Sequence, residues 1–228
     1  MWGLGALISR HAPPAQMGRE TAGISCCFDR QSQRMFQGFE KKGLSASALS
    51  IAEALTKNGL EGSTVLDVGC GFGALALELL RRGASRAVGI DLSPKMIQMA
   101  SVLTAVKGLS GLASFRVGDG ASSELPSSKT VILDGVLCCY PDLDALIDNS
   151  SSAAEAFYAI AVPDDTRFAT KVLGLFLPLQ GLVFGRGGFR FFVHPTRRIR
   201  GALQAKGFRL VSSSPAGWVW SVFVFRRT

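Results

Sequence analysis

Apolar residues follow two patterns that take turns along the middle of the chain. Short continuous apolar runs predict buried strands, whereas apolar residues spaced by three or four positions predict helices. The predicted strands cover residues 64–69, 86–91, 114–117, 130–137 and 157–162. Helical spacing fills gaps between them, at residues 73–82, 94–107 and 143–154. Strands that alternate with helices predict βαβ units, and therefore a parallel sheet covered by helices on both faces.

The C-terminal region departs from this alternation. A helix is predicted at residues 196–206, followed by strands at residues 208–213 and 218–225 with the turn residues Pro215-Ala216-Gly217 between them. Strands joined by so short a connection must run antiparallel. The sequence therefore predicts an α/β fold in which a mostly parallel, seven-stranded sheet ends in an antiparallel hairpin.

Segments outside the sheet divide into an arm, two helices and a lid. Residues 1–24 are rich in Gly, Ala and Pro without a sustained period, so a flexible or docking arm is expected there. The rest, residues 25–228, is one predicted domain that begins with two helices between about residues 27 and 58. The two N-terminal helices and residues 164–193, which include a helical region at residues 165–183, form the predicted substrate lid. The lid contains five phenylalanines that suit a hydrophobic or aromatic ligand, namely Phe176, Phe184, Phe189, Phe191 and Phe192.

A glycine-rich turn connects the first predicted strand to the helix after it. Gly69, Gly71 and Gly73 remove side chains where the chain turns tightly and a ligand approaches the backbone. Asp91 ends the second predicted strand, where a carboxylate can accept hydrogen bonds from both hydroxyls of an adenosine ribose. The pattern predicts a nucleoside-binding site.

The position of Asp67 favours a nucleoside that carries an amine over a dinucleotide as the ligand. It stands shortly before Gly69, where a carboxylate would repel a pyrophosphate but attract an ammonium group. The terminal hairpin also differs from a dinucleotide-binding domain, and no substrate domain of adequate length follows. Together with the later segment Gly118-Asp119-Gly120, these residues favour S-adenosylmethionine as the cofactor.

From about residue 50 to the C-terminus, these motifs resemble the class I S-adenosylmethionine-dependent methyltransferases, which have a Rossmann-like three-layer fold. The resemblance implies that the Gly69–Gly73 loop packs against the methionine portion of the cofactor and that Asp91 holds the ribose. It also implies that Leu92 flanks the adenine ring and that Asp119, beside Gly120, contacts the adenine amino group. The product of the cofactor would be S-adenosylhomocysteine.

A narrower resemblance rests on residues 133–141 and 192–195, which read LDGVLCCYP and FVHP. With the upstream pair Cys26-Cys27, these strings are similar to bacterial proteins grouped with the magnesium-protoporphyrin IX O-methyltransferases. That branch typically has His-Tyr-Pro where this chain has Cys139-Tyr140-Pro141. The resemblance favours oxygen as the methylated atom.

Methyl transfer depends on alignment of the acceptor, and ligands bind at the carboxyl ends of the strands in such sheets. The fourth predicted strand ends at Leu137, so Cys138 and Cys139 are candidate substrate contacts and Tyr140 is a candidate catalytic residue. His194 is a second candidate, as the general base that a phenol or amine acceptor needs and a carboxylate or thiolate does not. Two alternatives remain open. The cysteines can be small buried residues, and the histidine can end its segment and cap the following helix.

Composition narrows the choice of partners and compartment. Lys and Arg exceed Asp and Glu by 25 to 17, but the basic residues are scattered, which does not favour a nucleic-acid partner. The five cysteines include two adjacent pairs and do not suggest a disulfide framework, and no signal peptide is recognisable, so a cytoplasmic protein is expected. The longest apolar stretch, residues 172–185, is too short for a transmembrane helix, although transient contact with a membrane surface stays open.

The sequence thus predicts an enzyme that methylates a small, hydrophobic or aromatic molecule. A nucleic-acid methyltransferase is less favoured because the fourth strand lacks an Asn/Asp-Pro-Pro-aromatic motif. A thiol or metalloid methyltransferase stays open if Cys26 and Cys27 approach Cys138 and Cys139, although neither pair has zinc-site spacing and no metal is predicted. A protein that binds S-adenosylmethionine without turnover is a further alternative. Neither the acceptor nor the oligomeric state follows from the sequence.

Overall fold

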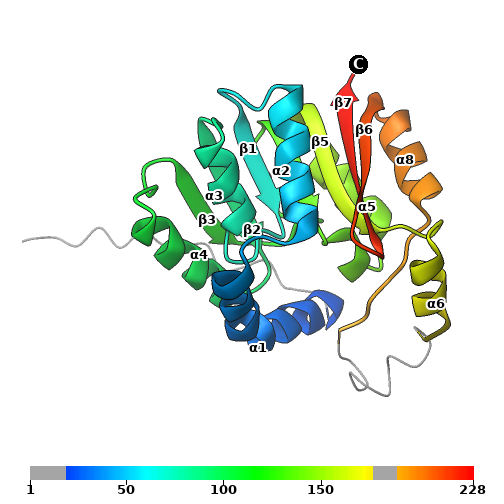
Figure 1. Cartoon of the computed structure of the whole chain (residues 1–228), viewed down its shortest axis with the longest axis horizontal. Coiled ribbons are helices and arrows are strands. Elements are labelled where there is room, and N and C mark those ends of the chain that lie inside the picture. Colours follow the sequence, from blue (N-terminus) through cyan, green and yellow to red (C-terminus); the bar gives the residue numbers. More distant parts are fainter. Residues whose placement is uncertain (1–18, 177–188) are drawn as a thin grey trace, which may run out of the picture.

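A seven-stranded sheet forms the centre of the fold (Figure 1). The structure is a computed structural model, and it describes residues 19–176 and 189–228. The strand order across the sheet is β3-β2-β1-β4-β5-β7-β6. The strands are β1 (Thr64–Val68), β2 (Arg86–Asp91), β3 (Ala113–Val117), β4 (Ser128–Asp134), β5 (Ala154–Pro163), β6 (Phe208–Ala216) and β7 (Trp220–Arg227).

The first five strands run parallel, and the last strand of the chain, β7, runs antiparallel to its neighbours. β1 pairs with β2 and β4, β3 extends the sheet beyond β2, and β5 extends it beyond β4. β7 lies between β5 and β6 and is antiparallel to both. This arrangement confirms the predicted Rossmann-like α/β fold with an antiparallel hairpin at one end of the sheet.

Helices cover both faces of the sheet and the edge where the parallel strands end. α2, α3 and α4 pack on one face, α5 and α8 pack on the other, and α1 lies across the edge (Figure 1). The helices are α1 (Arg19–Lys42), α2 (Ala46–Asn58), α3 (Ala74–Arg81), α4 (Pro94–Val106), α5 (Leu143–Ser152), α6 (Phe168–Phe176) and α8 (Thr196–Ala205), with a short 3₁₀ helix, η1 (Leu137–Cys139). α1 and α2 are the two helices that the sequence predicts before the sheet.

Each face of the sheet carries its own apolar core, because side chains alternate along a strand. In β4, Val131 and Leu133 enter the core beneath α5 and α8, whereas Ile132 enters the core beneath α2 and α3. Tyr158 of β5 is fully buried on the α5 side, where its hydroxyl and that of Ser150 lie 2.7 Å apart and share a hydrogen bond. Burial on both faces explains why the strands appear as continuous apolar runs in the sequence.

α1 is fixed to the fold at the beginning of α4. Ser93 caps α4 with its side chain, which accepts a hydrogen bond from the N–H of Met96. The Asp29 carboxylate of α1 accepts hydrogen bonds from the Ser93 hydroxyl and from the N–H of Lys95. Ser25 donates to the carbonyl of Leu92 at 2.9 Å. These bonds hold α1 over the carboxyl ends of the strands.

β4 is shorter than the sequence predicts. It ends at Asp134 rather than at Leu137, because Gly135 adopts a φ of +72°, a left-handed conformation that ends the extended chain. Leu137, Cys138 and Cys139 then form η1. This correction moves Asp134 from the middle of a strand to its carboxyl end.

Other boundaries also differ from the prediction. α1 begins at Arg19, so the last part of the expected arm is helical. β6 extends through Pro215 and Ala216, so the hairpin turns at residues 217–219. α6 accounts for part of the predicted lid helix, whose remainder beyond residue 176 lies outside the described residues, as does the arm up to residue 18.

Gly89 in β2 provides a test of the packing between strand and glycine turn. A Cβ atom there would lie 2.4 Å from the Phe115 ring and 2.7 Å from the Cys70 sulfur. We expect Gly89→Ala to lower the free energy of unfolding by about 1–3 kcal/mol, because these side chains would have to move.

Gly111→Ala is the matched control for this substitution, because a Cβ at Gly111 meets open space. It should change the free energy of unfolding by less than about 0.5 kcal/mol. Urea denaturation of both variants measures the difference. Equal effects of the two substitutions would contradict the packing around Gly89.

Candidate active site

Two adjoining cavities lie where α1 covers the carboxyl ends of β1, β2 and β4. The main cavity has a volume of about 440 Å³, and the adjoining cavity about 480 Å³. Met35, Ser45, Gly69, Gly71 and Asp134 line both cavities, so the two meet there. In Figure 1 this edge of the sheet faces α1. The candidate site therefore extends to both sides of the glycine-rich turn.

Gly69 and Gly71 form the part of the turn that a ligand can approach. Their φ angles are +73° and +53°, a left-handed backbone that favours glycine. A Cβ on Gly69 would lie 2.4 Å from a methyl group of Val136, whereas a Cβ on Gly71 would meet open space. The backbone at Gly71 is thus accessible from the cavities.

Gly73 has a different role from the first two glycines. It precedes α3 with a φ of +77°, and a Cβ there would lie 2.7 Å from the Phe115 ring. Gly73 is not among the described residues that line the two cavities, although its neighbours Phe72 and Ala74 line the adjoining cavity. Gly120 does line the main cavity, where a Cβ would lie 2.4 Å from Val68.

Asp91 ends β2 and is held from two sides. Its Oδ2 accepts a hydrogen bond from the N–H of Gly71 at 2.8 Å, and its Oδ1 accepts one from the N–H of Ser93 at 2.8 Å. Burial raises the pKa of Asp91, and these two N–H groups oppose the rise. Each oxygen of a carboxylate has a second lone pair, so Asp91 can still accept bonds from a pair of ligand hydroxyls.

Three carboxylates gather at the carboxyl ends of β1, β2 and β4. Burial raises the pKa of Asp67 well above its ordinary value, and the negative charges of Asp134 and Asp91 raise it further. Burial also raises the pKa of Asp134, although hydrogen bonds from the hydroxyls of Ser47 and Ser45 partly offset this rise. Asp67 lines the adjoining cavity, and Asp134 lines both. This acidic cluster, Asp67, Asp91 and Asp134, favours a positively charged group in its vicinity.

Asp119 and Tyr140 lie together beside the main cavity. The Tyr140 hydroxyl donates to Asp119 Oδ1 at 3.0 Å, and the N–H of Ala121 donates to the same oxygen at 2.9 Å. Tyr140 lines the main cavity, whereas Asp119 stands between the lining residues Gly118 and Gly120. Burial and the neighbouring Asp119 charge raise the pKa of Tyr140. Tyr140 is therefore a neutral hydrogen-bond donor rather than a base at neutral pH.

Cys138 and Cys139 both line the main cavity, as small buried residues. Their sulfur atoms are 3.9 Å apart, and the hydrogen bond with Cys139, with burial, raises the pKa of Cys138. Burial raises the pKa of Cys27 on α1, and the nearby Cys139 adds to the rise. Within residues 19–176 and 189–228, no three His, Cys, Asp or Glu side chains are grouped to hold a metal ion. The four-cysteine metal cluster considered from the sequence is not formed in this part of the chain.

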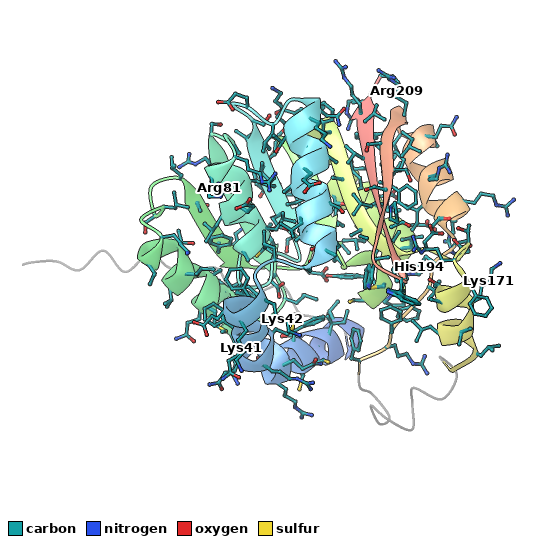
Figure 2. The ribbon with its side chains drawn as sticks, in the orientation of Figure 1. Lys41, Lys42, Arg81, Lys171, His194 and Arg209 are labelled. Atoms are coloured by element: carbon teal, nitrogen blue, oxygen red, sulfur yellow. The ribbon has the colours of Figure 1, made fainter. Side chains whose placement is uncertain are left out.

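His194 touches the Tyr140 segment but does not face the main cavity. Its Nε2 lies 2.9 Å from the carbonyl oxygen of Tyr140, so this nitrogen donates the hydrogen bond, and its ring stacks on Phe192. Figure 2 shows His194 near α6, at the edge of the sheet. His194 and Tyr140, the two candidate catalytic residues, are thus in contact, but through the main chain of Tyr140. His194 is not among the described residues that line the two cavities.

Aromatic rings form an apolar wall of the main cavity. Phe189 packs edge-on against Phe28 of α1 at 5.8 Å between ring centroids, and Phe191 packs edge-on against Trp220 at 6.5 Å. All four rings line the main cavity. The two phenylalanines come from the predicted lid, and a third lid phenylalanine, Phe184, lies outside the described residues.

Asp134 and Trp220 line the main cavity but are not predicted as site residues, and the N-terminal helices are predicted as part of the lid without naming the α1 side chains that line the cavity. Asp134 carries the same signal as Asp91, an acidic residue directly after a buried strand, but it was hidden by the overestimated length of β4. Trp220 and the α1 residues Ile24 and Phe28 line the main cavity only through long-range packing. No local pattern identifies such residues.

Comparisons with known proteins relate part of this chain to methyltransferases. Residues 65–163 match the family described as a methyltransferase domain. The ribosomal protein L11 methyltransferase of Edwardsiella ictaluri (strain 93-146) is 48% identical over 80 residues, which cover 34% of this chain and 27% of that protein. The magnesium-protoporphyrin O-methyltransferase of Rhodobacter capsulatus is 33% identical over 111 residues, which cover 48% of this chain and 49% of that protein. The matched regions thus span about half the length of these curated relatives, or less.

A solved structure extends the likeness to nearly the whole chain. The magnesium protoporphyrin IX methyltransferase from Synechocystis PCC 6803, determined with bound SAH, has a TM-score of 0.72 at 22% identity. The superposition covers 90% of this chain and 98% of that chain. At this identity the likeness establishes the fold, and the acceptor has to be argued from the cavity.

Asp67 provides a test of the acidic cluster through pH. Because the folded protein raises the pKa of Asp67, it binds the proton more tightly than the unfolded chain does, and stability falls as the pH rises from the ordinary aspartate range through the raised pKa. Asp67→Asn removes this loss. We expect the variant to raise the free energy of unfolding by about 1–2 kcal/mol at about pH 8 and to change it little at about pH 4, as measured by urea denaturation.

Asp164→Asn is the matched control, because the fold lowers the pKa of Asp164 and the substitution should change stability in the opposite direction. Burial alone would raise the pKa of Asp164, but hydrogen bonds from Thr166 and Ser221 and the charge of Arg167 lower it. The charged carboxylate therefore stabilises the fold above the ordinary aspartate pKa, and this stabilisation is lost as the pH falls through the lowered value. Asp164→Asn should destabilise the protein at about pH 8. If Asp67→Asn destabilises the protein at about pH 8 as much as Asp164→Asn does, the charged Asp67 carboxylate does not destabilise the fold.

Proposed function

We propose that this chain, a member of the class I S-adenosylmethionine-dependent methyltransferases, transfers the methyl group of S-adenosylmethionine to a small hydrophobic or aromatic acceptor. The observation that carries the proposal is the lining of the main cavity, which combines the carboxylates of Asp91 and Asp134 with aromatic rings. The carboxylates suit a cationic nucleoside, and the rings suit an apolar molecule. Oxygen is the favoured acceptor atom.

The donor end has the groups that a sulfonium nucleoside requires. Asp91 would accept the two ribose hydroxyls, and Asp67 with Asp134 would balance the positive charge of the methionine portion. The open backbone at Gly71 would allow the ligand to approach the turn closely. When bound, S-adenosylmethionine supplies a methyl group on a positively charged sulfur, which an acceptor can attack in line.

The adenine end would be formed by apolar side chains and one carboxylate. Leu92 is buried and lines the main cavity with Met96, which gives an adenine ring a flat apolar contact. Asp119 has one oxygen engaged by Tyr140, and its other oxygen can accept from an amino group. Gly118 and Gly120 border the cavity without side chains, so a ring can pass close to the backbone.

The acceptor end determines the substrate class. Phe28, Phe189, Phe191 and Trp220 offer ring edges and faces that stack with a planar apolar molecule. Cys138 and Cys139 would contact the acceptor as neutral thiols. Because the described residues form no metal cluster, a metalloid acceptor has no support from this part of the structure.

Tyr140 and His194 would act by positioning rather than by taking a proton. Tyr140 holds Asp119 through its hydroxyl, and His194 holds the carbonyl of Tyr140 through Nε2. A carboxylate acceptor needs no base, so these roles suffice for methylation of a carboxyl oxygen. The main contribution of the protein is then alignment of acceptor and donor within about 3–3.5 Å.

Binding of S-adenosylmethionine tests the donor end. Asp91→Asn should weaken binding by about tenfold or more, because charge-assisted hydrogen bonds are worth roughly 1.5–3 kcal/mol. Asp148→Asn is the control, because Asp148 forms an exposed ion pair with Lys206 and lines neither cavity. Calorimetric titration of both variants measures the difference. An unchanged affinity for Asp91→Asn would remove Asp91 from the site.

Turnover tests the acceptor end. Release of S-adenosylhomocysteine should be accelerated by one class in a panel of small aromatic carboxylic acids, phenols and thiols, with an oxygen acceptor preferred. Acceleration by thiols alone would contradict oxygen as the acceptor atom. Binding of S-adenosylmethionine without turnover on any aromatic acceptor would favour the alternative of a binding protein.

His194→Ala should reduce kcat more than the affinity for S-adenosylmethionine, because the Tyr140 carbonyl that His194 binds directly follows Cys139, a proposed acceptor contact. His194→Gln keeps a side-chain donor for the Tyr140 carbonyl, so it should restore much of the activity. Equal losses of kcat and affinity, with a lowered Tm, would indicate a structural role for His194 instead.

A further inference from the structure

An apolar stripe on α6 is exposed to solvent beside the β6–β7 hairpin. Phe168, Val172 and Leu175 recur at positions i, i+4 and i+7, so they share about 60° of arc on the helix. Phe168 is 81% exposed, Leu175 is 74% exposed, and Trp218 in the hairpin turn is 86% exposed. Phe168 and Trp218 border the same shallow depression. We call these four side chains the α6 patch.

Hydrogen bonds on the inner side of α6 hold the patch in place. Arg167 donates two bonds to carbonyls of the hairpin turn, including that of Trp218 at 3.1 Å. Thr170 donates to the carbonyl of Val219 at 3.1 Å. These polar contacts leave the opposite side of α6 to the apolar stripe. The exposure of the α6 patch is therefore a property of the folded protein.

Acidic groups near the α6 patch are used inside the fold. Asp164 Oδ2 accepts from the Ser221 hydroxyl at 2.8 Å. Asp165 Oδ1 accepts from the Thr196 hydroxyl at 2.7 Å, which joins the beginnings of α6 and α8. Both carboxylates keep their negative charge, but they are bonded into the fold, and the charge of Arg167 lies close to that of Asp164.

Basic groups near the α6 patch face solvent. Lys171 flanks the apolar stripe, and Figure 2 shows it on the outer side of α6. Arg190 is exposed in the segment before α8, and Arg197 is exposed in the first turn of α8. None of these three cations has an ion-pair partner among the described carboxylates. The apolar and aromatic side chains of the α6 patch are thus accompanied by positively charged side chains that have no ion-pair partner among the described residues.

The α6 patch lies at the same edge of the fold as the cavities. α6 follows β5, whose carboxyl end lies beside that of β4. Trp220, which lines the main cavity, follows Trp218 closely in the hairpin. A surface that contacts the α6 patch would therefore lie near the apolar wall of the main cavity.

We propose that the α6 patch docks this protein onto the surface of an anionic phospholipid bilayer. The rings of Phe168 and Trp218 and the side chain of Leu175 would enter the headgroup region, with Lys171 against the lipid phosphates. The contact is peripheral, since no helix in the described residues is long and apolar enough to cross a membrane. A second copy of this chain is a less suitable occupant, because it would bring two chains of net charge +8 together.

Vesicle co-sedimentation tests this surface with the full-length protein. Vesicles of phosphatidylcholine mixed with phosphatidylglycerol should bind the protein, and vesicles of phosphatidylcholine alone should bind it less. Added salt should weaken the binding to the anionic vesicles, because it screens the basic groups. The double variant Phe168→Glu, Trp218→Glu should lower the bound fraction at least about tenfold, because two apolar anchors become acidic. Val106→Glu is the matched control, because Val106 is 76% exposed on α4, away from the patch.

The outcomes separate docking from other roles of the patch. Unchanged Tm and affinity for S-adenosylmethionine in the double variant, with loss of vesicle binding that Val106→Glu does not share, would support the proposal. Failure of the wild-type protein to bind anionic vesicles would overturn it, as would equal losses in both variants. A dimer in light scattering that only the double variant dissociates would identify a second copy as the occupant and also overturn it.

Discussion

The hydrogen bond from the Gly71 N–H to the Asp91 carboxylate fixes the arrangement of the whole site. It joins the glycine-rich turn after β1 to the end of β2, at a point where parallel pairing already brings these strand ends together. Ser93 holds the other oxygen of Asp91, and Asp29 of α1 in turn accepts from Ser93. One chain of polar contacts thus sets the position of the turn, α4 and α1. The shape of both cavities follows from it.

The same site concentrates charge that the fold does not neutralise. Asp67 and Asp134 are buried beside Asp91, and burial raises the pKa of all three. A fold that keeps such groups together gives up stability, which a cationic ligand can restore by binding to the folded state. The acidic cluster therefore links the binding of a positively charged molecule to the stability of the sheet edge that binds it.

Local patterns in the sequence predicted the fold and the centre of the site. The alternation of apolar runs and helical spacing gave the sheet, and acidic residues after strands indicated where ligands bind. The end of β4 was predicted wrongly, because it depends on the positive φ of a single glycine, Gly135, rather than on hydrophobicity. Gly73 looks the same as Gly71 in the sequence, and only the structure shows that the Phe115 ring packs against Gly73.

Long-range contacts explain the rest of what the sequence did not reveal. Phe28 and Trp220 reach the main cavity from elements at opposite ends of the described chain, and no spacing rule connects them. His194 bonds the carbonyl of Tyr140, a contact that a list of reactive side chains cannot anticipate. Its ring was expected to face the ligand, and the fold turns it toward the backbone instead.

The position of β7 has a consequence for how the protein forms during synthesis. β6 is made before β7 but contacts the sheet only through β7, which lies between β6 and β5. Until β7 has left the ribosome, the edge of β5 has no partner and β6 has no strand to join. Trp220 completes the cavity wall with that same strand. A nascent chain therefore exposes an open sheet edge that a chaperone can protect, and its cavity closes in one late step.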